Sequence, residues 1–168
     1  MEQPPEGPIT AAVDVLADRW SLLILRDVIF ADRRYFRGLL TGSAEGIASN
    51  ILADRLKRLL DAGILTRGAA GRGQRARFSL TEAGIQTLPV LIALGDWGLE
   101  WRPSAPGSQS RQRVIRAGGD AFVAELMAEL RVRHLDAPAE FHDGPGPFAR
   151  LDAPDAEPDD LWGGPSTD

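Results

Sequence analysis

The sequence contains no cysteine. Disulfides, thiolate metal sites and cysteine-based redox sensing are therefore excluded. It also lacks an apolar run of the roughly 18 residues that a membrane helix needs, because Arg26 interrupts the most apolar stretch, residues 22–30. The first eight residues hold two Glu, three Pro and no basic residue, which is unlike a signal peptide. These absences favour a cytoplasmic protein with no membrane partner.

Positive charge is also scarce overall, since the formal net charge is -5. The distribution along the chain is uneven. Residues 33–77 contain ten basic and three acidic residues, a local charge of +7, whereas the residues after 102 contain six basic and twelve acidic ones, a local charge of -6. Because charges are screened over about 10 Å, phosphate binding depends on the local patch rather than on the total. Charge alone leaves two readings open, a phosphate-binding surface and a solvated charged face.

Helical periodicity organises the first sixty residues. Short helices are predicted at 9–17 and 35–40, and a helix that is apolar nearly all round, and therefore buried, at 20–30 after Asp18. The clearest helix spans 47–62, where Leu52, Leu56, Leu59 and Leu60 form one stripe. Gly63 stands where a helix commonly ends in a left-handed residue.

A β-hairpin and a long helix are expected next. Residues 64–67 and 75–80 have the length and pattern of strands, and the segment between them is rich in Gly and Arg. A helix is predicted from Thr81 to Trp101, with Pro89 tolerable only as a kink or in a first turn. The sequence thus predicts a mainly α domain with a small β-hairpin wing, a winged helix-turn-helix, over residues 1–102.

The C-terminal residues 103–168 are expected to form an extension. Residues 103–110 have the composition of a linker, and an amphipathic helix is predicted at about 120–134 with Asp120 as its N-cap. The Pro-, Gly- and Asp-rich remainder indicates a largely disordered acidic tail. Two roles stay open for the extension: a helix that docks on the preceding domain and regulates or stabilises an association between two copies of the chain, or a solubilising tail.

The helix at 47–62 and the wing are the predicted DNA-binding elements. With its apolar face in the core, the helix presents polar side chains that can hydrogen-bond base edges and phosphates in a major groove, and arginines of the wing can reach phosphates or a minor groove. The candidate DNA-binding residues are Arg37, Ser49, Asn50, Asp54, Arg55, Lys57, Arg58, Arg72 and Arg75. Arg55 is equally suited to a structural ion pair.

Five segments resemble HxlR-type regulators, relatives of the MarR group. They are residues 17–27 (ADRWSLLILRD), 35–40 (YFRGLL), 46–59 (GIASNILADRLKRL), 78–84 (FSLTEAG) and 93–98 (ALGDWG). Together they span about residues 8–102, in order and at the family's spacings. The resemblance implies a transcriptional regulator that binds a palindromic operator in double-stranded DNA as a homodimer, paired through its first and last helices. Many relatives carry a sensor cysteine before the first helix, where this chain has Gly7-Pro8-Ile9, so thiol sensing is not carried over.

Other chemistry finds little support. Trp20, Trp97 and Trp101 could frame a pocket for a small-molecule effector of unknown identity, but packing in the core or a dimer interface is the favoured interpretation. His134, His142 and Asp143 lack a recognised metal-ligand spacing. No nucleophile with a base and no cofactor loop is present, so we expect neither an enzyme, a cofactor nor a metal. The alternative function is a winged-helix protein-interaction module without DNA binding.

Overall fold

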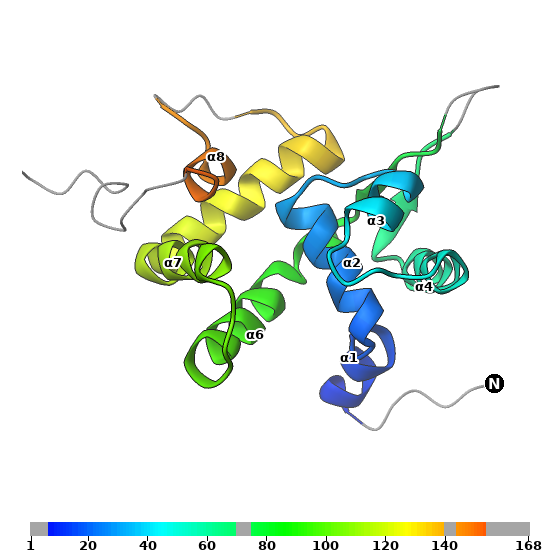
Figure 1. Ribbon diagram of the computed structural model, residues 1–168. Coiled ribbons are helices and arrows are strands. Elements are labelled where there is room, and N and C mark those ends of the chain that lie inside the picture. The colour runs from blue at the N-terminus through cyan, green and yellow to red at the C-terminus, as the bar shows by residue number, and fades with distance from the viewer. Residues whose placement is uncertain (1–6, 70–74, 140–143, 154–168) are drawn as a thin grey trace, which may run out of the picture. The chain divides into compact units, whose positions relative to one another are not determined.

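The computed structural model describes residues 7–69, 75–139 and 144–153 (Figure 1). The chain divides into two compact units, residues 1–85 and residues 86–168, and each is described by itself. This division precedes residue 102, where composition placed the start of the extension. Among the described residues the fold is mainly helical with one two-stranded antiparallel sheet, as predicted from the sequence.

The first unit has the element order predicted for a winged helix-turn-helix. Its elements are α1 (Pro8–Leu16), α2 (Arg19–Phe30), α3 (Phe36–Gly42), α4 (Ser49–Asp61), β1 (Leu65–Arg67), β2 (Phe78–Leu80) and α5 (Glu82–Ile85). Helix α2 begins where Asp18 caps it, because the Asp18 carboxylate accepts hydrogen bonds from the amides of Trp20 and Ser21, both at 3.0 Å. The predicted burial of this helix is confirmed, with Ile24, Leu25, Val28 and Ile29 buried.

The core of the first unit forms between α2, α3, α4 and the sheet. Fully buried side chains come from each of these elements: Leu25, Val28, Ile29, Leu39, Leu52, Leu59, Leu65 and Leu80. Helix α4 is terminated by Gly63, which follows its C-cap Ala62 and has a left-handed φ of 68°. The Gly63 amide then bonds Leu60 O at 3.0 Å and the Ile64 amide bonds Leu59 O at 2.9 Å, which satisfies the last carbonyls of the helix. The helix end predicted at Gly63 is therefore confirmed, and it aims the chain into β1.

The strands pair antiparallel with Thr66 opposite Ser79. Directly after β2, Gly84 of α5 lies so close to β1 that a Cβ atom would stand 2.3 Å from Ile64 O. The single helix predicted from Thr81 to Trp101 is wrong, but Pro89 takes one of the two positions that the sequence allowed for it. Because a helix-interior proline clashes with the carbonyl four residues earlier, here that of Ile85, α5 stops and a new helix starts with Pro89 in its first turn.

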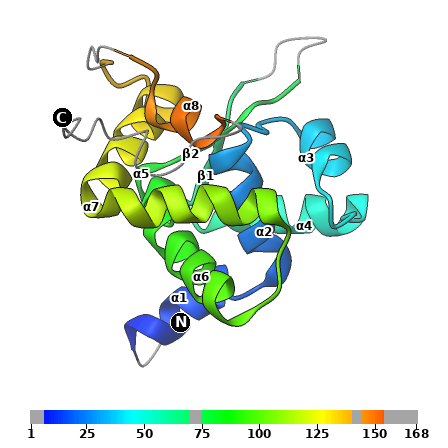
Figure 2. The same cartoon turned by 60° about the vertical axis from the view of Figure 1, so that its left-hand side comes forward.

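The second unit consists of α6 (Leu88–Trp101), α7 (Pro106–Leu135) and α8 (Pro147–Leu151). Helix α7 packs along both of the others (Figure 2). Its buried residues include Val114, Ile115, Phe122, Leu126 and Leu130. The Gln112 side chain joins α7 to α6, because its Nε2 donates hydrogen bonds to Ile92 O at 3.1 Å and to Asp96 Oδ1 at 3.0 Å.

The extension holds more structure than composition indicated. Helix α7 starts at Pro106, inside the expected linker, because proline fits a first helical turn. The helix predicted at 120–134 is its second half, set off by a non-helical Gly119 with φ 58°. Within the expected tail, α8 buries Phe148 and Leu151, and an Arg150–Glu125 ion pair ties α8 to α7. Residues 140–143 and 154–168 lie outside the described part of the chain.

Candidate nucleic-acid interface

Helix α4 separates an apolar face from a polar one. Leu52, Leu56 and Leu59 are buried. The candidates Ser49, Asn50, Asp54, Lys57 and Arg58 are all exposed, whereas Arg55 is half-buried. The Lys57 side chain is 75% exposed and pairs with Asp61 one turn later, a contact that raises the pKa of its ammonium group. The polar face therefore consists of hydroxyl, amide and charged groups that are all accessible to a nucleic acid.

Arg55 has a different environment from its neighbours on α4. Its guanidinium Nε lies 2.9 Å from Asp18 Oδ1, and it also pairs with Asp54. The hydrogen bond from Arg55 lowers the pKa of Asp18, and the hydrogen bonds from the amides of Ser21 and Trp20 lower it further. Asp18 thus joins the start of α2 to the middle of α4. These contacts favour the structural role that the sequence left open for Arg55.

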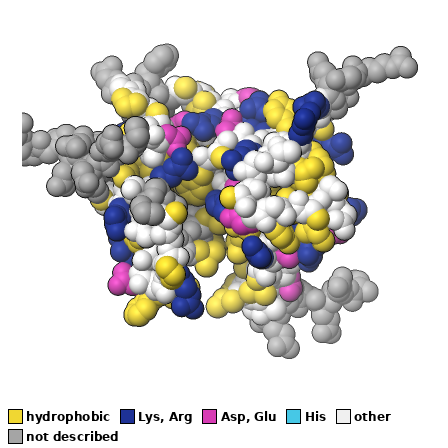
Figure 3. Space-filling view, viewed as in Figure 1, with side chains coloured by type: hydrophobic (Ala, Val, Ile, Leu, Met, Phe, Trp, Pro, Cys, Tyr) yellow, Lys and Arg dark blue, Asp and Glu magenta, His cyan; other side chains and the backbone are white. Residues whose placement is uncertain are grey.

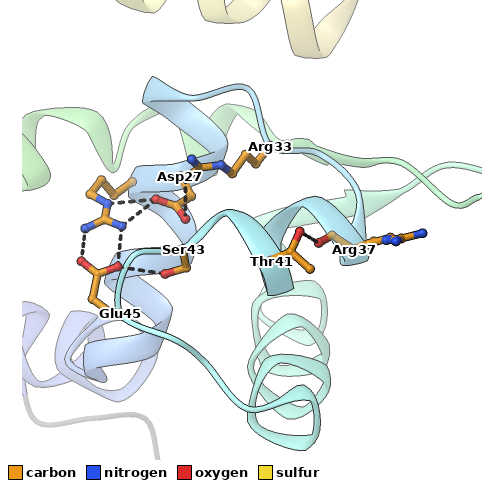
Figure 4. Close-up of polar contacts among 7 residues, drawn as sticks. Asp27, Arg33, Arg37, Thr41, Ser43 and Glu45 are labelled. Atoms are coloured by element: carbon orange, nitrogen blue, oxygen red, sulfur yellow. Dashed lines mark hydrogen bonds and ion pairs between the residues drawn. The ribbon is translucent and has the colours of Figure 1, made fainter.

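The turn between α3 and α4 is held by an ionic network (Figure 4). Arg26 of α2 donates to both carboxylate oxygens of Glu45, at 2.6 and 2.9 Å, and also to Asp27. The Ser43 hydroxyl donates to Glu45 at 2.8 Å, and Arg33 pairs with Asp27 at 3.1 Å. The Arg26 hydrogen bonds, with that from Ser43, hold the pKa of Glu45 at about 2. The network fixes the turn that sets the direction of α4.

Sequence reasoning missed this network. Arg26 and Asp27 are a charged pair in an otherwise apolar helix, and such residues are rarely buried without partners. That signal pointed to a polar contact but not to its partner, since Glu45 lies in a turn nineteen residues later.

The wing is anchored to the first unit by a buried arginine. Arg34 is 3% exposed, and its Nε donates to Phe78 O at 3.0 Å. The Phe78 amide in turn donates to Arg34 O at 2.8 Å, and Tyr35 forms a β-bridge with Arg77. Arg34 was counted in the basic patch, but it faces the interior. Together with Arg33 and Arg55, it is removed from the charge available to DNA by its contacts within the protein.

The remaining basic residues surround the polar face of α4. Arg37 at the start of α3, Arg67 of β1 and Arg75 before β2 are all exposed. Figure 3 shows Lys and Arg side chains over this part of the first unit, where α3, α4 and the wing lie. Arg72 lies outside the described residues, so its contact with DNA stays a prediction.

The sequence model of one protein family, described as HxlR-like helix-turn-helix, matches residues 15–106. The chain belongs to the HxlR-like helix-turn-helix family. Similar proteins include an HTH-type transcriptional regulator of Mycobacterium tuberculosis, itself uncharacterised, which is 33% identical over 111 residues, covering 66% of this chain and 68% of the relative. Another uncharacterised HTH-type transcriptional regulator, from Synechocystis, is 36% identical over 95 residues, or 56% and 69% of the two chains.

Two solved structures are similar to this HxlR-like chain. PA1607, described as a candidate transcription factor, has 34% sequence identity and a TM-score of 0.53, covering 60% of this chain and 68% of that one. A MarR-family regulator from Porphyromonas gingivalis, also a candidate, has 25% identity and a TM-score of 0.51, covering 60% and 98%. The resemblance seen in the sequence, and the fold it implied, are therefore confirmed.

The other sites considered in the sequence, for an effector or a metal, have little support in the described residues of this HxlR-like chain. Beside Trp20 the cavity holds only about 10 Å³, which is too small for an effector. Trp97 and Trp101 are 53% and 65% exposed, so they do not fill the core of their unit. No group of three metal-ligating residues occurs in the described ranges, and His142 and Asp143 lie outside them. None of the described helices is long and apolar enough to cross a membrane.

Proposed function

We propose that this HxlR-like protein is a transcriptional regulator that binds double-stranded DNA as a homodimer and has no catalytic activity of its own. The polar face of α4 carries the proposal. Its candidate base- and phosphate-contacting side chains are exposed, an ion pair between Arg55 and Asp18 holds the helix against the start of α2, and exposed arginines flank it. A major groove about 12 Å wide accepts such a helix.

Residue roles follow from the chemistry of the side chains. The Asn50 amide can donate to and accept from one adenine, and Ser49 can bond either kind of base. Asp54 suits the amino group of cytosine. Lys57, Arg58 and Arg37 suit phosphates, as do Arg75 and, by sequence alone, Arg72 at the wing. In this scheme Arg55 positions α4 through Asp18 and does not contact DNA.

The dimer is supported by apolar surface that each unit leaves exposed. On α6, Val90, Leu94, Trp97 and Trp101 recur at helical spacing and are between 43% and 65% exposed. On α1, Ile9 and Val13 are 80% and 51% exposed. Four large apolar side chains in one exposed stripe are unusual for a monomer. We propose that α6 and α1 pair with their copies across a two-fold axis.

Such a dimer would present two α4 helices about one DNA turn apart, roughly 34 Å, to a palindromic operator. It would act in the cytoplasm, and no cofactor enters the proposal. Footprinting on genomic fragments selected by the purified protein tests it. We expect a protected palindrome and binding that weakens steeply with salt, because phosphate contacts release counterions. Binding with no salt dependence, or no protected sequence at all, would refute DNA recognition.

A further inference from the structure

A short third segment lies along the wing strand β2. It consists of residues 34 and 35, between α2 and α3. The Phe78 amide donates to Arg34 O at 2.8 Å, and Tyr35 forms an antiparallel bridge with Arg77. On the other edge of β2, Arg77 O accepts from the Gly68 amide at 2.8 Å, where the chain continues from β1. The strand is therefore held on both edges.

The side chain of Arg34 adds a second grip on the same strand. It is 3% exposed, and its Nε donates to Phe78 O at 3.0 Å while its Nη2 donates to the Ser79 hydroxyl. Asp32, the nearest carboxylate, lies 3.9 Å from Nε. A buried cation contributes little stability that a well-packed apolar side chain would not also supply. What arginine adds here is direction, because its donors meet two consecutive residues of β2.

The strands of the wing are too short to fix their own register. They pair over three residues each, and a hairpin of two strands is marginally stable by itself. A slip of one residue would turn the buried Phe78 and Leu80 to the opposite face. It would also turn Arg75 over and move it by about 3.3 Å along the strand. A contact that meets two particular residues of β2 opposes this slip.

We propose that Arg34 is a positioning residue that fixes the register and direction of the wing. Its effect on DNA binding rests on the proposed function. Arg75 is exposed and lies two residues before the bridge at Arg77, about 7 Å away along an extended strand. Arg34 therefore controls whether Arg75 meets a phosphate, although Arg34 itself is buried and touches no DNA.

Hydrogen exchange of the free protein tests the first step without DNA. Arg34→Met keeps an unbranched side chain and removes its donors. We expect the amides of Phe78 and Gly68, which bond across the wing, to exchange at least about tenfold faster in this variant. The amides of Leu52 and Leu56 on α4 should keep their rates. Equal acceleration of both pairs, or of neither, overturns the proposal, because Arg34 would then act on the whole unit or not on the wing.

A second variant keeps the test decisive if Arg34→Met does not fold. Ser79→Ala removes only the hydroxyl that accepts from Arg34 and should speed exchange at Phe78 about threefold. Thr66→Ala is the matched control, since Thr66 stands opposite Ser79 and its exposed hydroxyl is directed to Ser79 O at 3.4 Å. It should change the rate by less than about twofold. Equal effects of the two alanine variants refute a specific role for the Arg34 contact.

A double-mutant cycle tests the second step on the genomic fragment that the protein protects in footprinting. Arg34→Met should weaken binding about tenfold and lower the salt slope, as Arg75→Ala does, since both remove a phosphate contact of the wing. With Arg75 already alanine, Arg34→Met should cost less than about threefold, whereas with Asn50→Ala on α4 it should still cost about tenfold. Effects of Arg34→Met and Arg75→Ala that simply multiply overturn the positioning role.

The two arms separate this inference from the proposed function. If no fragment is bound while the exchange rates change as expected, Arg34 fixes the wing and the proposed function falls. If DNA binds, and Arg34→Met leaves both its affinity and its salt slope unchanged, the role of Arg34 in DNA binding is refuted and the proposed function stands.

Discussion

Replacing Glu45 by Gln removes the charge at the centre of the turn before α4. In the folded protein Arg26 and Ser43 hold the pKa of Glu45 at about 2, against an ordinary value of 4.5. The full difference corresponds to roughly 3 kcal/mol at about 1.4 kcal/mol per pKa unit. The Arg26 side chain is 36% exposed and that of Glu45 24%, so solvent screening reduces this. We expect Glu45→Gln to cost about 1–2 kcal/mol at pH 7.

The sign of the pH dependence follows from the lowered pKa. The unfolded chain takes up a proton at Glu45 near pH 4.5, whereas the folded protein resists protonation until about pH 2. The ionic contribution of Glu45 is therefore present above pH 4.5 and is lost as the pH falls toward 2. The difference in stability between wild type and Glu45→Gln should shrink over this interval.

Thermal unfolding followed by circular dichroism measures the effect. For a chain of this size we expect the Tm of Glu45→Gln to lie about 2–8 °C below wild type at pH 7, and this difference to fall to roughly a quarter by pH 2.5. Glu100→Gln is the matched control, because Glu100 is 59% exposed and its nearest pair is 3.8 Å away. An unchanged Tm at pH 7, or a difference that is undiminished at pH 2.5, would show that the network does not stabilise the turn.

Three further changes probe other parts of the account. Gly84→Ala puts a Cβ 2.3 Å from a backbone carbonyl oxygen, so it should lower the free energy of unfolding in denaturant by about 1–3 kcal/mol. The control Gly38→Ala, whose Cβ meets nothing within 4 Å, should leave it unchanged. Equal effects would contradict the close packing of α5. Trp97→Glu should give a monomer in light scattering and the exposed Leu135→Glu a dimer; a dimer with Trp97→Glu argues against pairing through α6. Truncation after Arg102 removes α7, which packs on α6, and should lower the Tm; an unchanged Tm would mean that α7 adds no stability.

Local patterns predicted most of the first unit. The apolar stripe of α4 and the left-handed glycine at 63 are decided within one or two helical turns, and the structure has both of them. Wing strands were recognised because the segments flanking a Gly- and Arg-rich stretch alternate. The strands are shorter than predicted, since only Leu65–Arg67 and Phe78–Leu80 pair fully.

Contacts between distant residues decided what the sequence missed. Arg34 and Arg37 look alike in the sequence. Arg34 is nevertheless buried, and it donates a hydrogen bond to the carbonyl of Phe78, forty-four residues away. The helix predicted at 120–134 covers only the second half of α7, because residues 103–110 have the composition of a linker and Asp120 resembles an N-cap. Packing against α6 and α8 stabilises the longer helix.

Operator binding by Asn50→Ala and Lys57→Ala, measured by mobility shift over a range of salt, tests the central claim that α4 reads DNA. Both side chains are exposed, so neither change should unfold the protein. Asn50→Ala should lose about 1–3 kcal/mol of discrimination between operator and mutated operator. Lys57→Ala should weaken all sequences alike and lower the salt slope by about one per subunit. Wild-type affinity in both variants would contradict the account.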